Sequence, residues 1–210
     1  GQAIAHPCYD MLCKQGRMHP DVALFANRAF YESRLLPVGL PHQMESSEGI
    51  VRLAFYPSEA EPIGMPPKTN HSEARIVARL AAEIYEQYAE NFDEATTLGI
   101  ITPYRSQIAL IRQEIASLAI PALDSILVDT VERFQGSERD VIIYSCCVNY
   151  PYQLRLLSNL TEERGILIDR KLNVALTRAR KQLFLTGVRE LLMENQLYLN
   201  LIKLVSEQSV

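Results

Sequence analysis

The segment 141–148 constrains the fold more than any other part of the chain, because its sequence VIIYSCCV is apolar almost throughout. A strand with one face in water alternates apolar and polar residues. A parallel strand covered by helices on both faces is apolar at successive positions. The segment therefore predicts a buried strand of a parallel sheet.

Strands and helices alternate along the rest of the chain, as judged from the spacing of apolar residues. The expected strands are Ile50–Tyr56, Leu98–Thr102, Ser125–Val131 and Gln182–Val188. The expected helices are Asp21–Tyr31, a helix after Asn70 that ends near Tyr88, Ser106–Leu118, Leu172–Ala179 and Leu191–Val205. This order predicts an α/β fold, with helices on both faces of a mainly parallel sheet. Functional loops of such sheets lie at the carboxyl ends of the strands.

The stretch Glu59–Asn70 contains three prolines and a glycine, so it is expected to be a loop. At its end, Asn70 is followed three residues later by Glu73, which resembles a capping box, and Ser72 is an alternative cap. These signals place the start of a helix near residue 71.

Composition limits the classes of protein that remain. The 210 residues suit one domain, and their net charge of −4 does not suggest a dedicated nucleic-acid binder, which is usually basic. No apolar run is long enough to cross a membrane and no signal peptide is recognised, so we expect no membrane partner. The four cysteines lack C-x-x-C spacing, so we expect reduced thiols, no metal site and a cytoplasmic location. The abrupt start predicts a piece of a longer protein.

A first polar segment follows the strand expected at 98–102 and reads LGIITPYRSQ across 98–107. Tyr104, at the carboxyl end of this strand, is placed to stack on a nucleobase. The amino end of the next helix is placed to hold a phosphate. An ordinary strand–turn–helix junction is the alternative.

A second polar segment, VDTVERFQGSERDV, lies between two expected strands across 128–141. Gly136 permits close approach of the backbone to a ligand. Glu138 is placed to accept a hydrogen bond from a ribose hydroxyl or to orient a metal-bound water. A solvated loop of mixed charge is the alternative.

A third segment, Arg164–Lys181, carries six Lys or Arg residues against Asp169 alone. Arg178 closely follows the packed turn LNVAL, and an arginine held rigidly there can neutralise charge on a transferring phosphoryl group. A solvated charged face is the alternative. In a fourth segment, KQGRMHP, His19 precedes a helix and is expected to be a capping or core histidine, and Arg17 lies beside it.

Together the four segments resemble the motifs of superfamily-one helicases. KQGRMHP resembles their QYRMHP segment, GIITPYRSQ their motif IV, VDTVERFQGSERD their motif V and LNVALTRARK their motif VI. Their order resembles the second, C-terminal RecA-like motor domain, in the branch of the nonsense-mediated-decay helicase and its bacterial relatives. The resemblance extends from Lys14 to Gly187. It implies a RecA-like, P-loop-NTPase-type fold for the domain 1–210.

The resemblance also implies roles for particular residues. Arg178 corresponds to the arginine finger of motif VI, Arg17 to a second arginine on the phosphates, and Glu138 to a contact with the nucleotide ribose or the hydrolytic machinery. Gln135 and Gly136 shape the motif V loop and belong to the same nucleotide site. Four residues are expected to line the single-strand track: Thr102, Pro103, Tyr104 and Thr130. Its strand is expected to be DNA rather than RNA.

Three features qualify the resemblance. Gly16 stands where the family has an aromatic residue that packs near adenine. None of the nine glycines belongs to a G-x-x-x-x-G-K-[ST] phosphate loop. Asp93 and Glu94 imitate a Walker B pair, but they follow the tail of a helix and are interpreted as a surface turn.

ATP and Mg²⁺ are therefore expected in the parent protein, on an upstream RecA-like domain that contacts this one. We expect no ATPase activity and no bound cofactor in the isolated chain. The alternative is a degenerate motor domain that acts as a non-catalytic module for binding nucleic acid or protein. A stand-alone nucleotide enzyme, such as a small kinase, is disfavoured by the missing phosphate loop.

Overall fold

A computed structural model describes residues 13–134, 136–163 and 165–208. Its centre is a five-stranded sheet in which every neighbouring pair is parallel. From one edge to the other, the strands are β3 (Leu53–Ser58), β9 (Ala179–Val188), β6 (Arg139–Ser145), β4 (Leu98–Ile101) and β5 (Leu127–Asp129). The predicted α/β class is confirmed.

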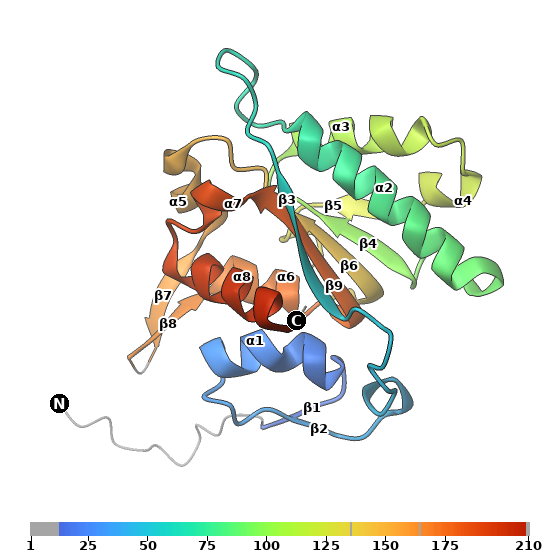
Figure 1. The fold of residues 1–210 in the computed structure, drawn as a ribbon. Helices are drawn as coiled ribbons and strands as arrows, with labels where there is room; N and C mark the ends of the chain where they lie inside the picture. The colour runs from blue at the N-terminus through green and yellow to red at the C-terminus, as the bar shows by residue number, and fades with distance from the viewer. Residues whose placement is uncertain (1–12, 135, 164, 209–210) are drawn as a thin grey trace.

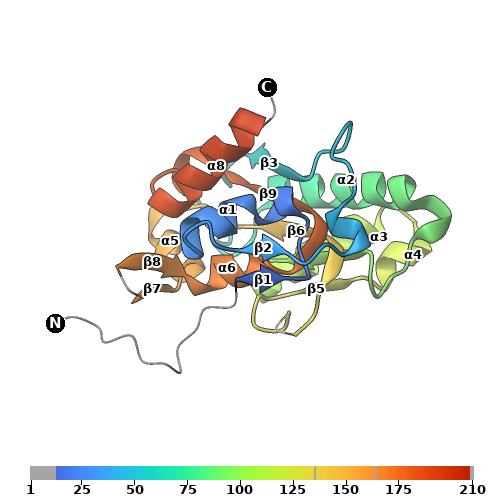
Figure 2. The ribbon, with the colours of Figure 1, turned by 90° about the horizontal axis from the view of Figure 1, so that it is seen from below.

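Helices cover both faces of this sheet (Figures 1 and 2). On one face lie α2 (His71–Tyr88) and α3 (Arg105–Ala116), followed by the short α4 (Pro121–Asp124). The other face is covered by α1 (Pro20–Phe30), α6 (Arg170–Leu176) and α8 (Gln196–Gln208). Figure 2 shows α1 and α8 on one side of the strands and α2 and α3 on the other.

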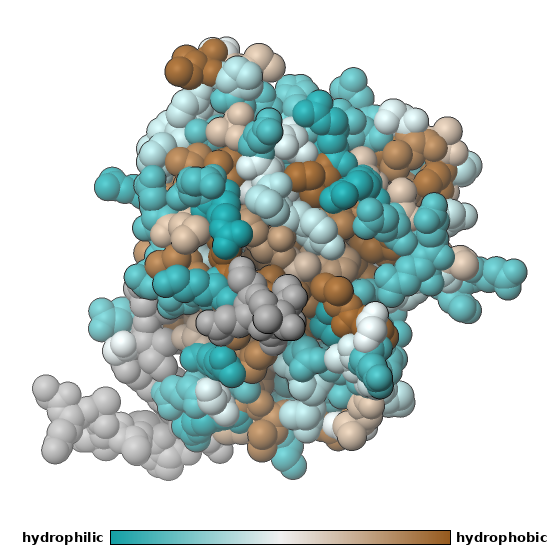
Figure 3. Space-filling view, viewed as in Figure 1, coloured by the Kyte–Doolittle hydropathy of each residue, from teal (hydrophilic) through white to brown (hydrophobic). Residues whose placement is uncertain are grey.

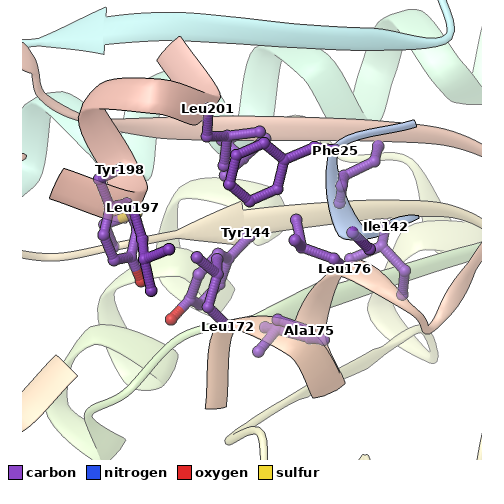
Figure 4. Close-up of a cluster of buried hydrophobic side chains, with 14 of the residues drawn as sticks. Phe25, Ile142, Tyr144, Leu172, Ala175, Leu176, Leu197, Tyr198 and Leu201 are labelled. Atoms are coloured by element: carbon purple, nitrogen blue, oxygen red, sulfur yellow. The ribbon is translucent and has the colours of Figure 1, made fainter. Parts of the chain in front are cut away.

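Strand β6 explains why its sequence is apolar at successive positions. Val141 and Ile143 pack into the hydrophobic cluster beneath α2 and α3, whereas Ile142 and Tyr144 pack into the cluster beneath α1, α6 and α8. All four side chains are almost completely buried. Figure 4 shows the second cluster, where Tyr144 lies among side chains from α6 and α8. The strand has no face left for water.

The other elements are short. They include the two-stranded parallel sheet of β1 (Lys14–Gln15) and β2 (Leu36–Pro37), the antiparallel hairpin of β7 (Leu160–Glu163) and β8 (Ile166–Asp169), and the helices α5 (Leu154–Leu157) and α7 (Arg189–Leu192). Single 3-10 turns are η1 (Pro41–Gln43), η2 (Ala89–Asn91) and η3 (Pro151–Gln153). No helix in the described part of the chain is long and apolar enough to cross a bilayer.

Two local expectations were wrong. The single helix expected over 191–205 is divided into α7 and α8, and Asn195 caps the start of α8 by accepting the Leu197 N–H at 2.9 Å. The hairpin β7–β8 was not predicted. The loop expected at 59–70 is confirmed, and Ile63 within it is 98% exposed. Figure 3 shows the mixture of hydrophilic and hydrophobic surface on this side of the molecule.

The capping box at the start of α2 is only half present. Asn70 accepts the N–H of Glu73 at 2.8 Å, which is the expected N-cap bond. The Glu73 carboxylate turns inward instead of back to the cap, and accepts hydrogen bonds from Ser145 and from the Cys147 N–H. The Asn70 N–H donates to Gln107 instead. The buried hydrogen bonds of the Glu73 carboxylate therefore replace the bond that would return to the Asn70 N–H in a full capping box.

Candidate functional site

Three segments far apart in the sequence meet at the amino-terminal edge of the sheet. Strands β6 and β9 start side by side, and the Arg139 N–H donates to the Arg178 carbonyl at 3.0 Å. The segment before α1 joins them, because the His19 N–H donates to the Arg180 carbonyl at 2.7 Å. These backbone bonds bring Arg17, Glu138 and Arg178 into one cluster.

Within this cluster the side chains of Arg17 and Glu138 contact each other directly, and Arg178 is bonded to backbone carbonyls. Arg17 Nε lies 2.7 Å from Glu138 Oε2, and Arg17 Nη1 donates to the Thr177 carbonyl at 3.2 Å. Arg178 donates to the carbonyls of Ser137 and Val174 at 3.2 and 3.3 Å. Each arginine is therefore held by backbone oxygens.

The charges of the cluster are not balanced. Burial lowers the pKa of Arg178, and repulsion from the Arg17 guanidinium lowers it further, while Glu138 acts in the opposite direction. The hydrogen bond from Arg17 lowers the pKa of Glu138, so this carboxyl is ionised at neutral pH. Two guanidinium groups that repel each other favour a bound anion between them.

Two residues of this edge received no role from the sequence. Arg180 Nε lies 3.9 Å from Glu138 Oε1, and its Nη1 lies 3.5 Å from Asp140. His42 Nε2 lies 2.7 Å from the Arg17 carbonyl oxygen. Arg180 is the second residue of β9 and lies two positions after Arg178 in the sequence R-A-R, so its closeness to the motif is a usable signal. His42 lies outside every recognised motif.

The residues expected to line a single strand lie at the opposite, carboxyl-terminal edge. Thr102 follows β4 and is completely buried, so its side chain lies beneath the surface rather than on it. Pro103 and Tyr104 are half-buried, and the ring centroid of Tyr104 lies 5.9 Å from Lys68 Nζ. Thr130 follows β5 and is half-buried. These residues therefore lie at the carboxyl ends of strands, whereas Glu138 and Arg178 directly precede β6 and β9 at the amino-terminal edge.

The segment 130–138 joins the two edges. Strands β5 and β6 both run parallel to β4, so the chain must return from the carboxyl end of β5 to the amino end of β6. The described residues of this segment, 130–134 and 136–138, form no helix, and Phe134 is fully buried. Gly136 has a positive φ of 84°, which favours glycine. Gln135 lies outside the described residues.

Gly99 in β4 provides the space for this crossing. A Cβ atom at this position would lie 2.9 Å from Phe134 Cε1 and 2.9 Å from Arg139 Cγ. Real Cβ atoms do not approach other atoms so closely. The ring of Phe134 therefore packs directly on the backbone of β4, and any side chain at residue 99 pushes segment 130–138 away from the sheet.

Three other expectations concern single residues. His19 caps α1 by accepting the Asp21 N–H at 3.2 Å and is buried, as expected. Asp93 lies in an exposed turn before β4 and accepts the N–H of Ala95 at 2.8 Å, so it does not form a Walker B pair at a strand end. A Cβ at Gly16 would lie 3.4 Å from a methyl group of Leu40, so this position borders an aliphatic surface rather than an aromatic ring.

Comparison with known proteins identifies the class. The family model described as "AAA domain" matches residues 3–190. Helicase sen1 of Schizosaccharomyces pombe is 30% identical over 204 residues, covering 91% of this chain and 11% of that protein. Regulator of nonsense transcripts 1 of Dictyostelium discoideum is 33% identical over 215 residues, covering 98% and 15%. The solved C-terminal domain of a possible DNA helicase from Lactobacillus plantarun WCFS1 has a TM-score of 0.45 at 14% identity, covering 83% of this chain and 88% of that one.

The chain belongs to this AAA-domain family. Within it, the chain is a C-terminal RecA-like domain of the superfamily-one helicase type, as its motifs predicted. It spans only 11% and 15% of the length of these two curated relatives. The activity, substrate and partners of a whole protein are therefore separate questions.

Proposed function

We propose that this chain is the C-terminal half of an ATP-dependent helicase or translocase motor that moves along single-stranded nucleic acid, DNA in preference to RNA. Its amino-terminal sheet edge faces ATP bound on an upstream RecA-like domain, and its carboxyl-terminal edge faces the strand. The observation that carries this proposal is the joining of Arg17, Glu138 and Arg178 at one edge, away from Tyr104 and Thr130 at the other.

The amino-terminal edge suits a polyphosphate. Arg17 and Arg178 repel each other and share Glu138 as a counter-ion, so an anion that enters between them relieves the repulsion. Guanidinium groups bind phosphate oxygens through paired N–H donors. ATP supplies a γ-phosphoryl group for transfer to water, with Mg²⁺ held by the upstream domain. On this side, Arg178 and Arg17 neutralise the charge on the phosphates. Glu138 is then released from Arg17 and can accept a hydrogen bond from a ribose hydroxyl.

The segment 130–138 suits a role in coupling the two edges. It begins at Thr130, near the proposed strand track, and ends at Glu138, beside the proposed phosphate site. Phe134 holds its middle against Gly99. A displacement of Glu138 when the phosphates arrive would then reach the other edge of the sheet through the buried Phe134, which packs beside Gly99.

The test uses the full-length protein that contains this chain. Arg178→Ala should reduce strand-stimulated ATP hydrolysis by about 10³-fold or more, because arginine fingers contribute that much to phosphoryl transfer. The matched control is Arg112→Ala, which removes an exposed arginine from α3, outside both edges. The 210-residue chain alone should show no ATPase activity above background. Hydrolysis by the isolated chain that Arg178→Ala abolishes would contradict the division of the site between two domains.

A second candidate is a degenerate motor domain that only binds nucleic acid or protein. Gly16 favours it, since the aliphatic surface beside this residue lacks an aromatic partner for adenine. In that case the full-length protein binds single strands, but its ATP hydrolysis is absent and does not respond to Arg178→Ala.

A further inference from the structure

A pair of tyrosines beside the proposed strand track has no role in the motifs. Tyr150 precedes the turn η3 and Tyr152 lies within it, after β6 and at the same carboxyl-terminal edge as Tyr104. Their ring centroids are 5.8 Å apart and their planes differ by only 11°. Tyr152 is 57% exposed. Tyr104 follows β4 at this edge, but its hydroxyl oxygen is buried.

Buried amide side chains hold this turn in place. The Gln153 side chain is almost completely buried, and its Oε1 accepts the N–H groups of Asn149 and Tyr150 at 2.8 and 2.9 Å. Its Nε2 donates to the Pro67 carbonyl at 2.6 Å. Asn149 Nδ2 donates to the Thr69 carbonyl at 2.7 Å. These bonds join the backbone of the turn that carries the two tyrosines to the end of the loop 59–70.

Basic side chains accompany the rings, together with the carboxylate of Glu194 near Tyr152. Lys68, Arg105 and Arg155 are exposed, and within the described part of the chain none has a carboxylate at salt-bridge distance. Lys68 belongs to the loop bound by Gln153, Arg105 follows Tyr104, and Arg155 follows Tyr152. The Glu61 side chain is only 8% exposed and pairs with His71 at 2.8 Å, so it adds little negative charge to the surface. Unpaired cations in an acidic chain indicate an anionic partner.

A hollow adjoins Tyr152. Its volume is about 570 Å³, and its lining includes Tyr152, Leu154, Arg155, Leu160 and one carboxylate, Glu194. This volume is within the range of sites that hold small organic molecules. A wall of one aromatic ring, aliphatic side chains and one arginine suits a nucleobase with its phosphate.

We propose that Tyr150 and Tyr152 form a base-stacking platform that extends the single-strand track beyond Tyr104, with Lys68, Arg105 and Arg155 contacting the phosphates. Aromatic rings interleaved with cations are the features by which proteins bind single strands without reading their sequence. The inference rests on the proposed function, since it takes single-stranded nucleic acid as the partner. It adds a binding site that the helicase motifs do not include.

The experiment measures binding of the 210-residue chain to fluorescein-labelled oligo(dT) and oligo(U) of about 12 nucleotides, by fluorescence anisotropy. The double variant Tyr150→Leu, Tyr152→Leu should raise Kd about tenfold, because stacking of one base contributes about that much. The matched double variant with Phe at both positions keeps the rings and should bind like the wild type. Circular dichroism melting checks that each variant is folded.

Salt dependence separates stacking from charge. Between about 50 and 200 mM salt, the Leu double variant should keep the wild-type slope of log Kd against log salt, because no phosphate contact is removed. Lys68→Gln should reduce that slope. If the Leu and Phe double variants bind with equal affinity while Lys68→Gln still weakens binding, the tyrosines do not stack on bases. That result would refute the stacking platform and leave the proposed function intact. No binding by the wild-type chain at low salt would overturn both.

Discussion

The buried carboxyl of Glu73 should make the stability of this protein depend on pH. Glu73 is fully buried in the first turn of α2 and accepts hydrogen bonds from Ser145 Oγ at 2.7 Å and from the Cys147 N–H at 2.9 Å. Burial raises its pKa from 4.5 to about 7, and these two hydrogen bonds only partly oppose the effect. The charged form of this side chain is therefore disfavoured in the folded state.

The direction of the effect follows from the two pKa values. Below about pH 4.5, Glu73 is protonated in both the folded and the unfolded state, and the folded state carries no penalty. As the pH rises through 4.5 and then 7, the unfolded chain loses its proton first, and stability falls. The full difference corresponds to about 3 kcal/mol, of which about 2.5 kcal/mol lies between about pH 5 and pH 8.

The assay compares urea unfolding of the wild type and Glu73→Gln at about pH 5, 6, 7 and 8. A neutral amide can still accept the Cys147 N–H and donate to Ser145, but it does not ionise. The variant should therefore gain about 2.5 kcal/mol relative to the wild type between the lowest and highest pH. Glu86→Gln, an exposed change on the same helix, is the control. Parallel stability profiles for the wild type and Glu73→Gln would refute the reasoning.

Three further predictions concern other contacts. Gly99→Ala should lower the free energy of unfolding by about 1–3 kcal/mol, because the added methyl meets Phe134; an unchanged urea midpoint would contradict the close contact. Glu138→Gln should increase the affinity of the chain for inorganic tripolyphosphate, measured by titration calorimetry, because Arg17 loses its counter-ion; weaker binding would contradict the anion site. Asn70→Ala should lower the free energy of unfolding, measured in urea, by about 1 kcal/mol or more, because α2 loses its N-cap hydrogen bond. An unchanged free energy would mean that water replaces the Asn70 side chain as the cap.

Much of the fold was accessible from sequence because its signals are local. The run at 141–148 predicted a strand buried on both faces, and the structure places it between two hydrophobic clusters. Asn70 predicted the start of α2, because an N-cap requires only a side chain within the same turn. The hairpin β7–β8 was missed because its segment, LTEERGILID, is charged at one end and apolar at the other, without regular alternation.

The sequence by itself determined the α/β class, the approximate positions of most elements and the set of charged residues near 17, 138 and 178. Tertiary structure alone decided how they are arranged. The return of 130–138 across β4 places Glu138 at the amino-terminal edge, opposite Thr130, and register between β6 and β9 sets Arg178 beside it. The physical reason is that periodicity and capping act over a few residues, whereas strand order, register and burial depend on segments that meet only when the whole chain packs.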